Sequence, residues 1–478
     1  MTEAPKLSLV GAELYERDVR LRLPFRFGIV TLNAAPQAFL RVGIRTADGR
    51  ESWGATAELM VPKWFDKNPA LSNEDNFNQL RLSIRRAVEA YRSAGPATAF
   101  GLTAATYPAL IEADDMPPLA AAFGGAQVDK AVLDALCRLE AISFADAIRT
   151  NLPGITNDLT PDLDKAEIGG VLNRLEYRPS IEARHTVGML DPLTSADLSA
   201  ADRLNDGLPE TLEEVIAAYG QTRFKLKIGG DIDADLDRLK RIASVLDPVD
   251  FRATLDGNEQ YGDAEGIVAL WQGIAAEPAL ANLASRILFI EQPIIRANAL
   301  SRDITKLADE KPIIIDESDA TFDAFPAARA LGYTGVSSKT CKGIYKSLLN
   351  AVRCSVWNAA GSPGRYFLSG EDLTCQAGLA VQQDLALVSL LGIGHVERNG
   401  HHYVHGMAGA PAAERDAFLA VHPDLYRRVD GSACLTIDGG RIALGSLDCP
   451  GFASGALPDF ETMRPVPLAP THLSAAGD

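Results

Sequence analysis

The sequence lacks several features that would place it outside or across a membrane. It has six cysteines among 478 residues and no Cys-x-x-Cys pair, so a disulfide framework is not predicted. No stretch approaches 18 uninterrupted apolar residues, and the first residues, MTEAPKLSLV, show no basic flank followed by an apolar run of signal type. We therefore expect a cytoplasmic protein with no membrane partner.

Positive charge is also scarce. Lysine and arginine together number 46 against 63 acidic residues, which gives a formal net charge of −17. Because nucleic-acid binding depends on basic surfaces, nucleic acid is not the expected partner. The apolar content of 47% and the charged content of 23% are typical of a globular protein with a large core.

From about residue 180 the chain alternates short apolar runs with amphipathic helical stretches. Eight such runs are candidate strands: 179–189, 223–228, 251–256, 286–291, 311–316, 334–339, 365–370 and 394–399. Alternating strands and helices predict a parallel sheet, and eight units favour a modified TIM-type (β/α)8 barrel over residues 179–410. A doubly wound open sheet is the alternative, but no Gly-rich dinucleotide motif follows an early strand.

The two ends of the chain show a different pattern. Residues 1–178 begin with strand-like runs around the turn ADGR and continue with helical stretches, which predicts a separate N-terminal α+β domain. Residues 411–478 include CLTIDGGRIAL, which has strand–turn–strand character. We expect this C-terminal segment to leave the barrel and complete the N-terminal domain.

Carboxylates end three successive strand candidates. Asp256, Glu291 and Asp316 each occupy the last position of an apolar run. In a barrel the C-terminal ends of the strands meet at one face, where active sites are built. Oxygen-only ligands suit a hard cation, so the three carboxylates predict a Mg²⁺ site, with Mn²⁺ as a plausible substitute.

Lysines end two further runs. Lys225 and Lys227 lie two positions apart and therefore point to the same face of a strand, where mutual repulsion should lower the pKa of at least one of them. Lys339 ends a run four strands further on and would face Lys227 across the barrel mouth. Taken singly, these residues have ordinary structural interpretations, Asp316 for instance as a helix cap. Their common position on successive strands favours a site that removes the α-proton of a carboxylate.

The same stretches resemble the enolase superfamily, specifically its muconate lactonizing enzyme branch. The matching motifs are KLKIGGD, LDGNEQY, IEQP, IIDES and SSKTCKGI, and PFRFG and WGATAEL resemble that superfamily's capping domain. The resemblance implies the roles already suggested for the three carboxylates, Lys227 and Lys339, and a homodimer or higher homo-oligomer. It further implies that Lys225 supports Lys227 electrostatically and that Asn258 and Glu317 surround the ligands.

The resemblance has departures. The stretch KTCKGIYK contains a second lysine, Lys342, and we favour Lys339 as the one facing the metal. The seventh strand, YFLSGEDLT, has no histidine, which speaks against the mandelate racemase branch.

Further substrate contacts are predicted from position alone: His185, Glu371 and Glu397 at strand ends, and Arg26, Phe27 and Trp64 in N-terminal loops. His401, His402 and His405 follow the eighth strand, where a surface or loop cluster is favoured over a transition-metal site.

The sequence thus predicts a Mg²⁺-dependent enzyme acting on a small carboxylate through an enediolate. Racemisation or epimerisation, cycloisomerisation and elimination, such as dehydration, all remain open because one lysine pair serves all three. The alternative is a non-catalytic protein that keeps an enolase-like metal or ligand site.

Overall fold

The computed structural model describes residues 3–28, 30–113, 115–361 and 363–468. Within these ranges eight parallel strands form a closed barrel, because each strand pairs with the next and the last pairs with the first. They are β4 (Ser180–Val187), β5 (Arg223–Lys227), β6 (Arg252–Asp256), β7 (Ile287–Glu291), β8 (Ile313–Ile315), β9 (Gly335–Ser338), β10 (Phe367–Gly370) and β11 (His395–Arg398). The predicted barrel and its strands are confirmed, and the open sheet is wrong.

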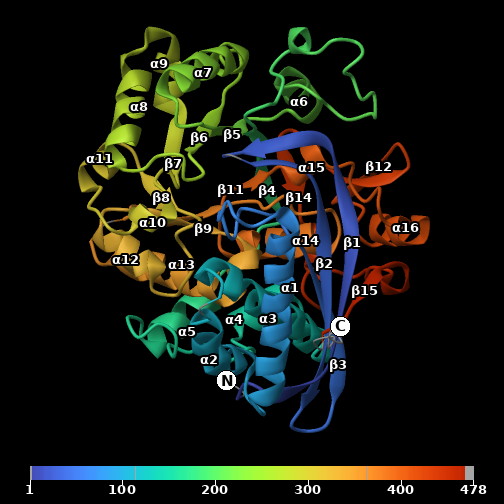
Figure 1. Cartoon of the computed structure of the whole chain (residues 1–478). Coiled ribbons are helices and arrows are strands. Elements are labelled where there is room, and N and C mark those ends of the chain that lie inside the picture. The colour runs from blue at the N-terminus through green and yellow to red at the C-terminus, as the bar shows by residue number, and fades with distance from the viewer. Residues whose placement is uncertain (1–2, 29, 114, 362, 469–478) are drawn as a thin grey trace, which may run out of the picture.

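Helices connect the barrel strands, as Figure 1 shows. α6 illustrates how the sequence sets their ends: Thr211 caps its first turn in a reciprocal arrangement with Glu214, and Gly220 ends it at φ 64°. The connecting helices are α6 (Leu212–Tyr219), α7 (Ile232–Leu246), α8 (Ala264–Ala276), α9 (Ala281–Arg286), α10 (Arg296–Ala299), α11 (Thr305–Glu310), α12 (Ala324–Ala330), α13 (Ile344–Ala359) and α14 (Leu379–Leu390), and α15 (Gly400–Tyr403) follows β11.

The N-terminal domain is α+β, as predicted. It supplies three antiparallel strands of a four-stranded sheet: β1 (Leu7–Phe27), β2 (Val30–Thr46) and β3 (Glu51–Leu59). Its helices are α1 (Asn73–Ser93), α2 (Ala99–Ile111), α3 (Pro118–Leu139), α4 (Phe144–Arg149) and α5 (Lys165–Asn173). In Figure 1 the β1–β2 hairpin runs along one side of the molecule and bends over the barrel, where Phe25 stacks on Tyr403 at 4.2 Å between ring centres.

The C-terminal segment contacts both the barrel and the N-terminal sheet. It contains α16 (Ala412–Val421), β12 (Tyr426–Val429), β13 (Ser432–Leu435), β14 (Arg441–Ala443) and β15 (Arg464–Val466). β14 pairs antiparallel with barrel strand β4, and β15 pairs with β1. The predicted strand–turn–strand stretch forms β13 and β14, but β13 pairs with β12, so the two strands belong to different sheets.

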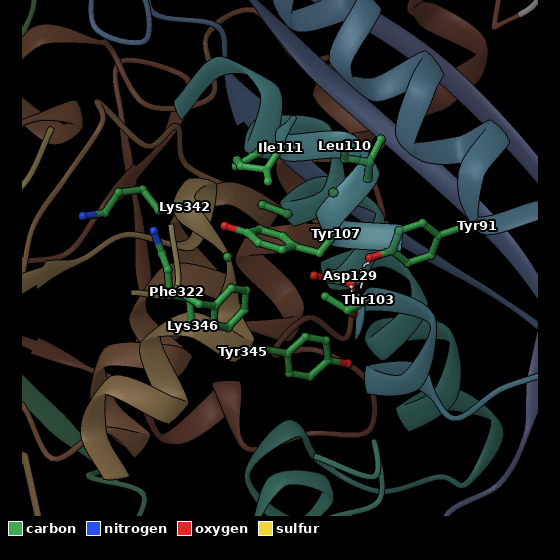
Figure 2. Close-up of a pocket in the computed structure, with 14 residues that line it drawn as sticks. Tyr91, Thr103, Tyr107, Leu110, Ile111, Asp129, Phe322, Lys342, Tyr345 and Lys346 are labelled. Carbon is green, nitrogen blue, oxygen red and sulfur yellow. Dashed lines mark hydrogen bonds between the residues drawn. The ribbon is translucent and has the colours of Figure 1, made fainter. Parts of the chain in front are cut away.

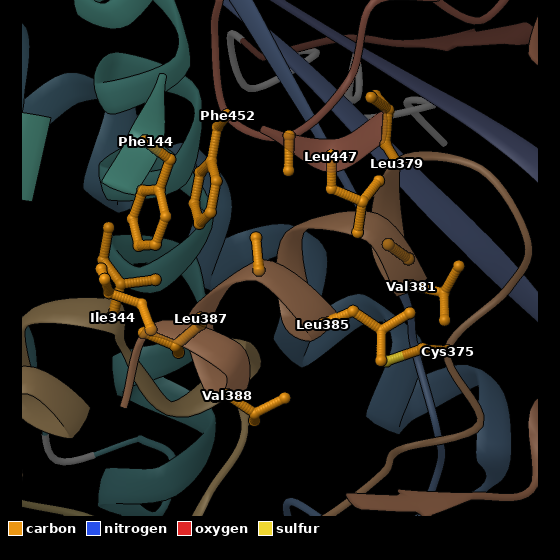
Figure 3. Close-up of a cluster of buried hydrophobic side chains, with 14 of the residues drawn as sticks. Phe144, Ile344, Cys375, Leu379, Val381, Leu385, Leu387, Val388, Leu447 and Phe452 are labelled. Carbon is orange, nitrogen blue, oxygen red and sulfur yellow. The ribbon is translucent and has the colours of Figure 1, made fainter. Parts of the chain in front are cut away.

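Helix α14 lies at the junction of these parts and is buried along its whole length. Figure 3 shows Leu387 of this helix on the side of the stacked rings of Phe144 and Phe452, and Leu385 beside Cys375. Gln383 on this helix accepts a hydrogen bond from Thr56 Oγ1 at 2.7 Å and donates to the Ala55 carbonyl at 2.8 Å. Because both partners lie on β3, these bonds tie the N-terminal sheet to the barrel.

Within the described ranges, no single helix has the length and apolar composition of a membrane span. The bent pair formed by α8 and residues 278–286 has the required length and apolar composition only when its two parts are counted together.

Helix α3 approaches β3 closely because Gly54 has no side chain. A Cβ atom there would lie 2.2 Å from both the Ala131 carbonyl oxygen and the Ala135 nitrogen. These are backbone atoms of a long buried helix, so they cannot rotate away.

We therefore predict that Gly54→Ala lowers the free energy of unfolding by about 1–3 kcal/mol, the usual cost of overpacking a core. The matched control is Gly169→Ala in α5, where no atom outside the local chain lies within 4 Å of the added carbon. That change should leave stability unchanged or raise it by about 0.5–1 kcal/mol. Thermal unfolding of both variants tests the pair, and equal effects would contradict the packing argument.

Candidate functional site

The predicted carboxylates and lysines meet at the C-terminal ends of the barrel strands. Asp256 and Glu291 end β6 and β7 in register with each other, and Lys227 on β5 pairs in register with Asp256. Asp316 and Lys339 directly follow β8 and β9. All are buried, so every charge here needs a partner inside the protein.

Lys225 lies at the centre of the cluster. Its Nζ lies 2.9 Å from Asp256 Oδ2, 2.8 Å from Glu291 Oε2, 2.7 Å from Glu371 Oε2 and 2.8 Å from Glu397 Oε2. Burial alone would lower the pKa of Lys225, but the four carboxylates raise it well above its usual value. For Lys225 the direction is therefore opposite to that expected from repulsion by Lys227.

Lys227 and Lys339 have fewer partners. Lys227 Nζ donates to Asp256 Oδ2 at 2.6 Å and to Asn258 Oδ1 at 2.8 Å. Lys339 Nζ donates to Asp316 Oδ2 at 2.6 Å and lies 4.5 Å from the ring centre of Trp64. Burial would lower the pKa of Lys339, but Asp316 raises it.

Both lysines line one cavity, which we call the mouth cavity. Its apolar wall comes from Phe25, Phe27, Val61, Trp64 and Leu373, and its polar wall from Lys225, Lys227, Asn258, Lys339, Asp372, Thr374, Glu397 and Asn399. The space open to water centres is about 20 Å³, enough for little more than one water molecule. N-terminal side chains thus close this cavity over the barrel strands.

Lys342 lies elsewhere. Its Nζ donates to Ser337 Oγ at 2.6 Å and contacts Asp316 Oδ1 at 3.2 Å and Asp319 Oδ2 at 3.0 Å. Asp316 is therefore held between two lysines, through Oδ2 by Lys339 and through Oδ1 by Lys342. Of these two, Lys339 lines the mouth cavity, whereas Lys342 lines a different one.

The three carboxylates predicted to bind metal are held by lysines in this structure. Across the described residues, no group of three His, Cys, Asp or Glu side chains is arranged as a ready metal site. Glu291 shares one cation, Lys225, with three other carboxylates: Lys225 Nζ donates to Glu291 Oε1 at 3.0 Å and lies 2.8 Å from its Oε2, which accepts no hydrogen bond of its own. Burial and the charges of Asp256 and Glu371 raise the pKa of Glu291 well above its usual value. A hard dication would relieve this repulsion, so the oxygen-only donor set fits Mg²⁺ chemically.

Asn258 and Glu317 lie beside these groups. Asn258 Nδ2 donates to Glu317 Oε1 at 3.2 Å, which links the loop after β6 to the loop after β8. Burial, followed by the charges of Asp316 and Glu259, raises the pKa of Glu317 to about 7.

The residues predicted to contact substrate fall into two groups. Phe27, Trp64 and Glu397 line the mouth cavity. Glu371 is buried beneath it, where it binds Lys225 and Arg184. Arg26 is exposed, because it alternates with the inward Phe25 and Phe27.

His185 also faces away from the mouth. Its neighbours Arg184 and Thr186 bond Glu371 and Glu397 inside the barrel, so the side chain between them points outward. It packs instead against His402, at 4.9 Å between ring centres. Prediction from the sequence missed Phe25, although its spacing from Phe27 places both rings on one face.

The histidines after β11 are not a surface cluster, so that prediction is wrong for His402. His402 is buried, and burial lowers its pKa well below the usual value. His401 is half-buried beside His185, at 5.5 Å between ring centres. Nε2 of His405 lies 3.2 Å from the backbone carbonyl oxygen of Asp206.

Part of the chain, which includes this cluster, matches a known protein family. A family model described as enolase C-terminal domain-like matches residues 207–424. This part of the chain is therefore enolase C-terminal domain-like. The matched region contains every carboxylate and lysine of the cluster, so the resemblance to the enolase superfamily is confirmed.

Solved structures with this enolase-like fold cover nearly the whole chain. An N-succinyl Arg/Lys racemase from Bacillus cereus has a TM-score of 0.62 at 15% identity, over 95% of this chain and 96% of its own. A muconate lactonizing enzyme from Pseudomonas fluorescens, complexed with muconolactone, has a TM-score of 0.59 at 17% identity, over 95% and 97%. A dipeptide epimerase from Enterococcus faecalis, complexed with Mg and the dipeptide L-Leu-L-Tyr, has a TM-score of 0.58 at 14% identity, over 94% and 99%. No curated protein matches this chain.

A second cavity separates the enolase-like barrel from the N-terminal helices. It lies between α2, α3 and the start of α13, and Figure 2 shows Asp129 in its wall, with Lys342 and Lys346 at one side. Asp129 Oδ1 accepts hydrogen bonds from Tyr91 and Thr103, each at 2.6 Å. Burial raises the pKa of Asp129 to about 7, and the two hydrogen bonds only partly oppose it.

This buried acid should make stability depend on pH. Because its pKa is higher in the folded state than in the unfolded state, Asp129 stabilises the fold below about pH 4 and loses that contribution as pH rises to about 7. Asp129→Asn keeps an oxygen acceptor without the charge. We predict that the variant gains about 2–4 kcal/mol relative to the wild type between pH 4 and pH 7.5. Urea unfolding at both values tests this, and parallel pH profiles would contradict it.

Proposed function

We propose that this protein is an enzyme that removes the α-proton of a small carboxylate substrate, with Lys227 and Lys339 as its two acid/base residues. The observation that carries the proposal is their placement. Both ammonium groups line the mouth cavity, Lys227 from the end of β5 and Lys339 from the position just after β9. Each keeps at least one N–H bond that no described carboxylate accepts.

The proposed metal ligands are Asp256, Glu291 and Asp316, with Mg²⁺ as the expected ion. When bound, a divalent cation would neutralise the substrate carboxylate and the negative charge that develops on it. The chain's own residues supply the remaining steps. Asn258 holds Lys227 through its Oδ1, and the Trp64 ring lies against Lys339.

The proton step needs one lysine in its neutral form. That amine takes the α-proton, the C–H electron pair enters the enediolate, and the opposite ammonium can return a proton to the other face. Return to the opposite face gives racemisation or epimerisation. Loss of a β leaving group gives elimination. In cycloisomerisation an internal carboxylate oxygen adds to a conjugated C=C bond, the electron pair of that bond forms the enolate, and an ammonium group protonates it. The racemase, epimerase and lactonizing enzyme among the similar structures support this general type of reaction.

The closed cavity also indicates which parts of the protein must move before a substrate can enter. Phe25, Phe27 and Trp64 belong to the N-terminal domain and cover the lysines. Since the cavity admits little more than one water molecule, these segments must move outward for substrate to bind. Their apolar character favours a carboxylate that carries an apolar substituent.

A non-catalytic ligand- or metal-binding role is the second candidate. The observation in its favour is that lysines already neutralise Asp256, Glu291 and Asp316.

The expected cytoplasmic location and homo-oligomeric state remain predictions.

We predict that Lys227→Met and Lys339→Met each reduce proton exchange by at least about 100-fold, the usual contribution of an acid/base group. The measurement is deuterium uptake from D2O by a library of amino-acid derivatives, dipeptides, acid sugars, hydroxy acids and lactones, read by mass spectrometry with Mg²⁺ present. The exposed Lys306 supplies the control, Lys306→Met. Exchange that survives both mouth substitutions would sink the two-lysine assignment.

We also predict that Mg²⁺ stabilises the protein. At 100 times its Kd a ligand adds about 2.7 kcal/mol, which thermal unfolding resolves against a chelator. Glu291→Gln should abolish this stabilisation because it removes a charged ligand. In chelator it should leave Tm unchanged or raised, since burial already disfavours the Glu291 charge. A Glu291→Gln protein that responds to Mg²⁺ like the wild type would rule out Glu291 as a ligand.

A further inference from the structure

The contacts of Lys225 set it apart from the other two lysines of the mouth. We propose that Lys225 is a fixed internal counter-ion for Glu371 and Glu397, which occupies both carboxylates and so withholds them from a substrate. This role does not depend on the proposed reaction.

The first argument is a count of donors. An ammonium group has three N–H bonds. Those of Lys225 are donated to Glu291 Oε1 at 3.0 Å, Glu371 Oε2 at 2.7 Å and Glu397 Oε2 at 2.8 Å, and Asp256 adds a fourth carboxylate at 2.9 Å. Every donor is thus used. Lys227 has two such bonds and Lys339 has one, so those lysines keep donors for a ligand.

The second argument is how the surrounding carboxylates are shared. Glu371 also pairs with the buried Arg184, and Asp256 also pairs with Lys227. Glu397 receives its other hydrogen bonds from uncharged groups: the Thr186 hydroxyl, the Asn399 amide and the Asp372 backbone nitrogen. In the part of the chain that the structure describes, Lys225 is therefore the one cation paired with Glu397.

The third argument is the span of the contact. Lys225 projects from β5, whereas Glu291 ends β7, Glu371 directly follows β10 and Glu397 lies within β11. One ammonium thus joins strands on several sides of the barrel. Glu371, just after β10, and Glu397, within β11, lie on the side of the barrel opposite the three predicted metal ligands. Their oxygens are occupied by Lys225, Arg184 and neighbouring groups. They are therefore part of this internal ion cluster and are not free to bind a cationic substrate.

Two double variants, each combining Lys225→Met with one glutamate-to-glutamine substitution, separate this role from a general effect of charge. Lys225→Met should lower Tm by about 3–5 °C in the presence of a chelator, because it leaves buried carboxylates uncompensated. Adding Glu397→Gln removes a charge that has lost its cation and should restore at least half of that loss. Adding Glu371→Gln should restore none of it, because Glu371 retains Arg184 and its removal leaves that guanidinium unpaired.

The outcomes are decisive in chelator, where no added metal can compensate. Recovery by Glu397→Gln alone supports the proposal. Equal recovery in both double variants, or an unchanged Tm in Lys225→Met, overturns it. If Lys225→Met does not fold, the single variants decide: Glu371→Gln must lower Tm more than Glu397→Gln, since it orphans Arg184 as well. The opposite order would overturn the assignment.

Discussion

The neutralisation of buried carboxylates by lysines at the barrel mouth is the interaction on which the rest of this site depends. Asp256, Glu291, Asp316, Glu371 and Glu397 all lie within the barrel with almost no exposure. Isolated charges of one sign could not be buried together at acceptable cost. The barrel meets the requirement by placing Lys225 and Lys227 on β5 and Lys339 just after β9. Lys225 contacts four of the carboxylates, Lys227 contacts Asp256 and Lys339 contacts Asp316.

This electrostatic arrangement divides the mouth into an inner and an outer layer. Lys225 and the glutamates of β7, β10 and β11 form the inner layer, in which donors and acceptors are almost fully matched. Lys227 and Lys339 form the outer layer and lie beneath aromatic rings of the N-terminal domain. The mouth cavity is lined by these two lysines and also reaches Lys225 and Glu397 of the inner layer. Asp256 and Asn258 hold Lys227 in place, and Asp316 holds Lys339. The N-terminal domain then determines the shape and polarity of the space in which they act.

Much of this could be predicted from the sequence, because strand ends in a parallel barrel have a fixed meaning. The apolar runs located all eight strands, and their last residues located Lys227, Asp256, Glu291, Asp316 and Lys339 at one face. The direction of the Lys225 pKa could not be predicted, because it depends on Glu371 and Glu397, which are distant in sequence and meet Lys225 only when the barrel closes. The outward direction of His185 likewise depends on the register of β4, in which Arg184 and Thr186 point into the barrel and His185, between them, points out.

The central claim is that the mouth binds a divalent cation through Asp256, Glu291 and Asp316 while Lys225 stays with its glutamates. Its most direct test is a crystal structure of the protein soaked in Mn²⁺, located by its anomalous signal. The account predicts one ion bound to these three carboxylates, with Lys225 Nζ still within hydrogen-bond distance of Glu371 and Glu397. An ion bound by Glu371 and Glu397 with Lys225 displaced, or no ion at the mouth at saturating Mn²⁺, would contradict it.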